Sequence, residues 1–300
     1  MTTQIVNRKS ISQMAFGALL LGATAISAAP ILVRLSEVGP VSTAFWRMSF
    51  ALPFFWSWML SKSPTPRTTL ELPRQAGFGW VLLTGLFFAA DLTAWHWSLH
   101  FTTVVNSLIL ANCAPIFVTL GAWLFFRQPV TPTFLLGLTI AIVGAILLVG
   151  AGFDLNQQNW FGDLLAVLTA IFYASYILSI KQARHYFPTA TVLGWSGLVA
   201  SGCLLGIAFL SGEIFWATTL LGWLVLISLA LIAQVGGQSL ITYALAHLPA
   251  PFSSVTLLLQ PVLATIFAWL ILSESIGLGQ AVGGVIVLSG IFLARQGSDV

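Results

Sequence analysis

The sequence predicts an all-α integral membrane protein of ten transmembrane helices, arranged as two inverted five-helix repeats with both termini in the cytoplasm. Three observations support this fold. Only 6% of the 300 residues are charged and 58% are hydrophobic, whereas a soluble domain contains roughly 25% charged residues. Apolar runs long enough to cross a bilayer recur along the whole chain. The second half of the chain also repeats a pattern of the first half, at the spacing that separates Pro115 from Pro261.

The apolar runs give the positions of the predicted spans. A helix needs about 20 apolar residues to cross a bilayer, and only helices or closed barrels satisfy their backbone polar groups in lipid. Because the runs are continuous rather than alternating, they predict helices. The first run is longer than the core of a secretory signal peptide, so we expect it to be retained. The ten predicted spans are 14–33, 42–60, 77–98, 103–126, 132–150, 160–180, 189–210, 219–240, 250–272 and 277–295.

The positions of Lys and Arg predict the orientation, because cytoplasmic loops are enriched in these residues. With the N-terminus inside, the inner segments hold nine of the 11 Lys and Arg residues, while Arg34 lies outside and Arg47 lies in a span. The net charge is +3, but the cations are scattered between apolar blocks, which does not indicate nucleic-acid binding. We therefore expect a multi-pass protein of the inner (cytoplasmic) membrane, surrounded by the lipid bilayer.

The internal repeat divides the chain into two halves, 1–150 and 151–300. Each half holds five spans, an odd number, so the second half enters the membrane from the opposite side. Inverted repeats with a site between them are an architecture of secondary transporters. When the sequence is aligned with itself at the spacing that places Pro115 on Pro261, Trp123 falls on Trp269, Gly137 on Gly283 and Gly144 on Gly290.

This repeated pattern resembles the paired signature of the drug/metabolite transporter superfamily, EamA type. Residues 114–144 and their echo 260–290 are similar to that signature, with a proline in the fourth helix and a glycine-patterned fifth helix. The turn at Glu274 resembles the family's second-repeat acid, which Gln128 replaces in the first repeat, and Arg47 resembles the family's basic residue of the second helix. The resemblance implies a ten-helix exporter of small metabolites. Size and aromatic content look most like the aromatic amino-acid exporters of the YddG type.

Asp91 places a carboxylate in the middle of the third predicted span. Ionisable residues inside a membrane are costly and are functional candidates by default. At helical spacing Phe88, Asp91 and Trp95 share a face, which we expect to point into the protein. Three roles stay open for Asp91: contact with a substrate amine, coupling to protons, or a structural hydrogen bond to a neighbouring helix.

Arg47 is the second ionisable residue inside a span. It either gates transport or contacts a substrate carboxylate, or it anchors the helix by extending to the outer interface. In the anchoring interpretation, Glu37 or Glu274 would be its partner.

Neutral polar residues recur at mid-span in both halves and predict a polar-lined cavity. Gln234 and Gln238 are four residues apart and flank the repeat equivalent of Asp91. Pro115 and Pro261 each remove one helix hydrogen bond, so we expect equivalent kinks that act as hinges or line the cavity. For any single polar residue, a helix-to-helix hydrogen bond is the alternative. The predicted cavity residues are Asp91, Trp95, Asn112, Gln234, Gln238, Tyr243, Gln260, Thr24, Ser27, Tyr173 and Tyr176.

Two glycine pairs predict close helix packing. Gly137 and Gly144, and their echoes Gly283 and Gly290, each form a small-residue stripe on one helix face. We expect the fifth and tenth spans to be packing helices rather than cavity linings. A monomer is favoured, and a homodimer across these stripes is the alternative.

No enzyme motif is present in the sequence, which lacks G-x-S-x-G, H-E-x-x-H and a nucleotide-binding glycine loop. The four histidines and two cysteines have no metal-ligand spacing, so we expect no cofactor and no enzymatic activity. The sequence therefore favours a secondary transporter that exports small amphiphilic metabolites, above all (aromatic) amino acids, by alternating access. The alternatives are a broad-specificity, proton-driven drug/metabolite effluxer of the same fold and an intramembrane enzyme.

Overall fold

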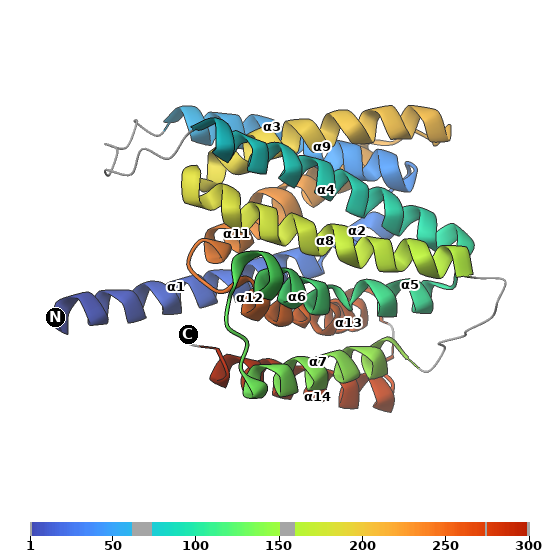
Figure 1. Ribbon diagram of the computed structural model, residues 1–300. Coiled ribbons are helices and arrows are strands. Elements are labelled where there is room, and N and C mark those ends of the chain that lie inside the picture. The colour runs from blue at the N-terminus through green and yellow to red at the C-terminus, as the bar shows by residue number, and fades with distance from the viewer. Residues whose placement is uncertain (1, 62–73, 151–159, 274, 299–300) are drawn as a thin grey trace.

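The computed structural model describes residues 2–61, 74–150, 160–273 and 275–298, and these residues form helices and turns without a strand. Glu274, named above in the family resemblance, lies outside the described residues, as do Lys62 and Arg67, two of the nine Lys and Arg residues assigned to the inner segments. The helices run side by side as one bundle, and the start of α1 and the end of α14 lie at the same end of it (Figure 1).

Helix boundaries follow the predicted spans closely. The first half holds α1 (Thr2–Ser27), α2 (Ala29–Arg34), α3 (Pro40–Ser61), α4 (Arg74–Phe101), α5 (Val104–Ala111), α6 (Ala114–Phe126) and α7 (Pro132–Val149). The second half holds α8 (Trp160–Tyr186), α9 (Thr189–Ser211), α10 (Leu220–Leu229), the π-helix η2 (Ala230–Gln238), α11 (Ser239–Leu245), α12 (Ala250–Leu257), α13 (Leu259–Leu272) and α14 (Leu278–Gln296).

Nine stretches of the described residues are long and apolar enough to cross a membrane. They coincide with nine of the ten predicted spans. The exception is the predicted span 42–60, where α3 is a helix of 22 residues but is not among the nine. Its Ser, Trp, Pro and Arg residues lower the hydropathy of that stretch.

The two spans that contain Pro115 and Pro261 are interrupted at equivalent positions. α5 ends at Ala111 and α12 ends at Leu257, each four residues before the proline. Because proline has no N–H to donate to the carbonyl four residues earlier, the helix breaks where that hydrogen bond would have formed. The expected pair of kinks is therefore present at Pro115 and Pro261. That they act as hinges stays a prediction.

The glycine stripes of α7 and α14 pack against each other, as their spacing predicts. A Cβ atom built on Gly137 would lie 2.3 Å from the backbone nitrogen of Ala294, and one on Gly290 would lie 2.3 Å from that of Ala141. The two backbones therefore touch directly. Because each stripe is covered by the other within one chain, neither is free for the homodimer seam considered above.

Two glutamates in different loops cap two helices in a crossed arrangement. Glu37, in the loop before α3, caps α10, and Glu213, in the loop before α10, caps α3. Glu37 Oε2, in the loop before α3, accepts hydrogen bonds from the backbone N–H groups of Thr218 at 2.9 Å and Thr219 at 3.1 Å, at the start of α10. Glu213 Oε2, in the loop before α10, accepts one from the N–H of Val41 at 2.9 Å, at the start of α3. Carboxylates at helix N-termini satisfy otherwise unpaired N–H groups. The exchange therefore ties the start of α3 to the start of α10.

The Glu37 cap predicts a pH-dependent stability. Its hydrogen bonds, above all that from the Thr219 hydroxyl, lower the pKa of Glu37 below its ordinary value of 4.5. The stabilisation is then complete above that value and is lost as the pH falls through the lower pKa of the folded protein. We expect Glu37→Gln to lower the Tm of the detergent-solubilised protein at pH 7, with the difference from wild type shrinking below about pH 4. A Tm difference independent of pH would contradict a cap by the charged carboxylate.

Candidate functional site

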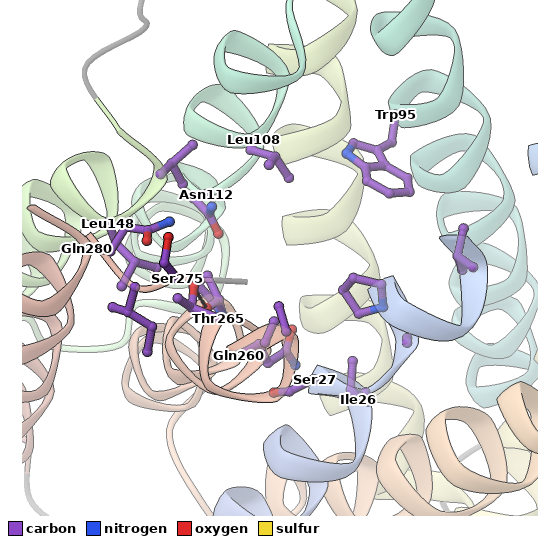
Figure 2. Close-up of a pocket in the computed structure, with 18 of the residues that line it drawn as sticks. Ile26, Ser27, Trp95, Leu108, Asn112, Leu148, Gln260, Thr265, Ser275 and Gln280 are labelled. Carbon is purple, nitrogen blue, oxygen red and sulfur yellow. Dashed lines mark hydrogen bonds between the residues drawn. The ribbon is translucent and has the colours of Figure 1, made fainter. Parts of the chain in front are cut away.

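A cavity of about 470 Å³ lies at the end of the bundle away from the termini. Its walls include Ser27 at the end of α1, Val149 at the end of α7 and Gln280 in the first turn of α14. Figure 2 shows the Trp95 indole and several aliphatic side chains around the space. The polar side chains that line it are Ser27, Arg47, Asn112, Gln260, Thr265, Ser275 and Gln280.

Arg47 carries the charge of this cavity. Among the described lining residues it is the single ionised side chain, and none of them is an acid. Its Nε donates a hydrogen bond to Gln234 Oε1 at 3.0 Å, which fixes one edge of the planar guanidinium group. Glu37, one of the two possible partners considered for Arg47, is engaged as the cap of α10. The other, Glu274, lies outside the described residues.

Arg47 also contacts a buried polar cluster whose residues do not line the cavity. Gln234 and Gln238, both on η2, are 1% and 5% exposed. They reach different helices, since Gln234 binds Arg47 of α3 while Gln238 makes a side-chain hydrogen bond with Tyr176 of α8. The sequence contains no signal for the π-helical geometry of η2. Such segments often occur at functional sites.

Asp91 belongs to this cluster and is not among the residues that line the cavity. It is 7% exposed and interacts electrostatically with Arg47, with the half-buried Tyr173 and with the buried Tyr176. Within the described residues no ion pair closer than 4.0 Å joins Asp91 to a cation. The ring of Phe88, one helical turn away, stacks on Tyr176 at 4.5 Å between ring centroids. The shared face therefore points into the protein, as expected, with Trp95 reaching the cavity.

The structure divides the predicted site residues into three groups. Ser27, Arg47, Trp95, Asn112, Gln260 and Pro261 line the cavity. Asp91, Tyr173, Tyr176, Gln234 and Gln238 form the cluster behind it. Thr24, Tyr243 and Pro115 lie away from both. The Thr24 hydroxyl bonds the carbonyl of Leu20 at 2.8 Å, and the Tyr243 ring packs on His247.

Sequence reasoning missed three polar residues of the cavity, namely Thr265, Ser275 and Gln280. Thr265 lies in the middle of α13, and Ser275 and Gln280 lie around the start of α14. The packing helices α7 and α14 also contribute to the cavity wall, through Val149 and Gln280, which was not expected.

Two further ionisable residues were misplaced or missed. α8 continues to Tyr186 rather than ending near residue 180, so Lys181 lies on the helix instead of in an inner loop. Its Nζ donates hydrogen bonds to the carbonyls of Leu245 at 3.2 Å and Leu248 at 2.6 Å, which offsets burial of the charge. Asp163, near the start of α8, accepts a hydrogen bond from the Thr102 hydroxyl at 2.5 Å.

Comparison with known proteins identifies the family. Both halves of the chain match the EamA-like transporter family, over residues 13–150 and 160–296. The chain belongs to this family. The resemblance inferred from the proline and glycine pattern is thereby confirmed, and the protein is a multi-pass membrane transporter with a small-molecule substrate.

Relatives within the family have different names. The chain is 26% identical over 273 residues to an uncharacterized transporter of Archaeoglobus fulgidus, covering 88% of this chain and 90% of the relative. It is 27% identical to the pseudopaline exporter CntI of Pseudomonas aeruginosa (75% and 78% covered) and 23% identical to a riboflavin transporter of Brucella anthropi (86% and 89% covered). A solved crystal structure shares the fold, with a TM-score of 0.76 at 18% identity over 96% of this chain and 97% of that chain.

Proposed function

We propose that this EamA-like transporter exports small amphiphilic molecules that carry a carboxylate beside an apolar or aromatic group, with aromatic amino acids as the simplest members. The observation that carries the proposal is Arg47, a cation in a largely apolar cavity whose described lining contains no acid. A planar guanidinium group binds carboxylates through paired hydrogen bonds. Trp95 and the aliphatic wall would hold the apolar part of the substrate.

The proposed transport cycle is alternating access across the bacterial inner membrane by a monomer of ten spans. α3 supplies the tenth span, the halves 1–150 and 151–300 are the inverted repeats, and both termini lie in the cytoplasm. The common position of the two chain ends in Figure 1 supports an even number of spans. Because the cavity lies at the opposite end, the structure corresponds to an outward-facing state in this proposal.

Cysteine labelling tests whether α3 crosses the membrane. In a background without Cys113 and Cys203, Leu35→Cys should react with an impermeant maleimide in intact cells, because it precedes α3 on the outer side. Ser61→Cys, at the other end of α3, should react only after the membrane is permeabilised. Both side chains are exposed. Reaction of both cysteines from the same side would show that α3 does not span.

The main rival is a proton-driven effluxer of drugs, which are often cationic. A guanidinium group with no acid among the described residues of the cavity wall repels cations in a low-dielectric cavity, so the described lining disfavours this substrate class. The names of the relatives refer to different molecules, pseudopaline and riboflavin, and the substrate must therefore be decided by the residues of this chain. An intramembrane enzyme would need a reactive group in the cavity, and none of the described lining residues is a Cys, His, Asp or Glu.

Counterflow into proteoliposomes tests the proposal, because it needs no knowledge of the driving ion. Vesicles are loaded with unlabelled phenylalanine, threonine or a cationic dye, and entry of labelled phenylalanine is followed. We expect exchange with phenylalanine, weaker exchange with threonine because it cannot fill the apolar wall, and none with the dye. A second series follows labelled dye into vesicles loaded with unlabelled dye. Exchange of the dye without any exchange of labelled phenylalanine would favour the drug effluxer and contradict the proposal.

A further inference from the structure

We propose that the cavity wall formed by α5, α13 and the start of α14 is a subsite for an uncharged hydrogen-bonding group of the substrate, above all a carbonyl oxygen. This inference rests on the proposed function, in which Arg47 holds the carboxylate. The subsite then selects the substituent at the end of the substrate opposite the carboxylate, and it favours a polar substituent over an unsubstituted aromatic ring.

Three carboxamides and two hydroxyls gather in this part of the cavity. Figure 2 shows Asn112, Gln280, Ser275 and Thr265 on the side of the cavity away from Trp95, with Gln260 between the two sides. None of the five is charged. Since an isolated charge would be costly to bring into such a wall, an uncharged polar group is the ligand that fits.

The hydrogen bonds already made leave the amide donors of Gln260 and Gln280 unused. Gln260 Nε2 is buried without a hydrogen-bond partner among the described residues. Gln280 Oε1 accepts from the backbone N–H of Gly277 at 3.0 Å, so its amide NH₂ remains to donate. The Thr265 hydroxyl already donates to the carbonyl of Pro261 at 3.0 Å and keeps only the capacity to accept. A buried donor without an acceptor is unfavourable, and a substrate carbonyl would supply that acceptor.

The subsite and Arg47 lie on different walls. Arg47 is on α3, which packs on α4, α9 and η2, whereas Gln280 is on α14, which packs on α7. In Figure 1, α3 and α14 lie at opposite sides of the bundle. A substrate that reaches both groups therefore has its carboxylate and its second polar group at opposite ends, with an apolar middle beside Trp95.

Matched phenylalanine analogues test the subsite. Labelled phenylalanine counterflow is inhibited with 4-carbamoylphenylalanine, 4-methylphenylalanine or 4-aminomethylphenylalanine, which place an amide, a methyl group or a cation at the same position. We expect the carbamoyl compound to have an inhibition constant roughly 5- to 10-fold lower than that of the methyl compound, as one or two added hydrogen bonds would give.

Substitutions in this wall should change the ratio between two inhibition constants, which a general loss of folding or transport would leave unchanged. Asn112→Leu and Gln260→Leu should each reduce the ratio between the carbamoyl and methyl inhibition constants. Gln280→Glu keeps the oxygen that caps Gly277 but replaces the amide donor by a negative charge. It should therefore reverse the preference, so that the aminomethyl compound inhibits more strongly than the carbamoyl compound.

Each outcome separates the subsite from the proposed function. Equal inhibition by the carbamoyl and methyl compounds, while phenylalanine exchange still depends on Arg47, would overturn the subsite alone. A carbamoyl preference that survives all three substitutions would also overturn it. Failure of phenylalanine to exchange at all would overturn the proposed function and this inference together.

Discussion

Replacing Arg47 by glutamine is expected to weaken the binding of carboxylate substrates roughly 10- to 100-fold, the effect of losing hydrogen bonds to a charged group. The side chain of glutamine keeps a donor near Gln234 but has no charge. Arg47→Lys should lie between wild type and Arg47→Gln, because an ammonium group keeps the charge but cannot form the planar paired contact. The half-saturating concentration in counterflow, measured for phenylalanine, gives the comparison.

Asp91→Asn is the matched control, because Asp91 interacts electrostatically with Arg47 from behind the cavity. Asparagine is the neutral isostere of the acid, so phenylalanine should bind as tightly as in wild type if Asp91 is protonated and several-fold more tightly if it is ionised. If Asp91→Asn weakens phenylalanine binding and spares an analogue without the amine, then Asp91 contacts the amine. If the variant abolishes proton-driven accumulation but spares counterflow, Asp91 couples protons.

Substitution in the α7–α14 seam should cause the largest loss of stability. A Cβ atom on Gly290 would lie 2.3 Å from a backbone nitrogen of α7, and one on Gly144 would lie 2.5 Å from the backbone nitrogen of Val287. Because the clashing atoms are backbone, the helices must separate. We expect Gly290→Val and Gly144→Val each to lower stability by about 3 kcal/mol or more. Thermal unfolding in detergent should show a Tm on the order of 5–10 °C lower.

Gly279→Ala is the control on the same helix, because a Cβ atom there meets nothing within 4 Å. Alanine at an open helical position is neutral or stabilising by about 0.5–1 kcal/mol. An equal loss of Tm for Gly279→Ala and Gly290→Val would mean that α14 is sensitive to any substitution, and the close backbone approach would not be the cause.

Much of the fold could be predicted from the sequence, because a helix that crosses a membrane requires a long apolar run that is easily recognised in the sequence. The apolar runs, the glycine stripes and the two prolines each act through one physical rule, and their consequences appear at the expected residues. α3 shows the limit of hydropathy. Arg47 lines the cavity, Ser42 is buried, and the Ser49 hydroxyl forms a hydrogen bond with that of Ser201 at 2.7 Å. These interior residues make the helix less apolar than its neighbours.

The site was predictable only in part, since spacing along one helix does not say which helix lies opposite. Asp91 and Trp95 share a face of α4, yet Trp95 reaches the cavity while Asp91 ends in the cluster behind Arg47. Gln234 forms its hydrogen bond with Arg47 from a π-helix, and no residue pattern predicts that helix. Gln280 stands near the outer end of its span, where an interfacial role and a cavity role look the same in sequence.

The central claim is that a carboxylate substrate binds in this cavity with its carboxylate on Arg47. A crystal structure with bound 4-iodophenylalanine tests it most directly, because the iodine position is given by its anomalous scattering. We predict an iodine peak inside the cavity, with the carboxylate within hydrogen-bonding distance of the Arg47 guanidinium group. An iodine peak instead in the groove lined by Trp123, Leu124, Arg127, Gln128 and Pro129, with the cavity empty of ligand, would contradict the claim.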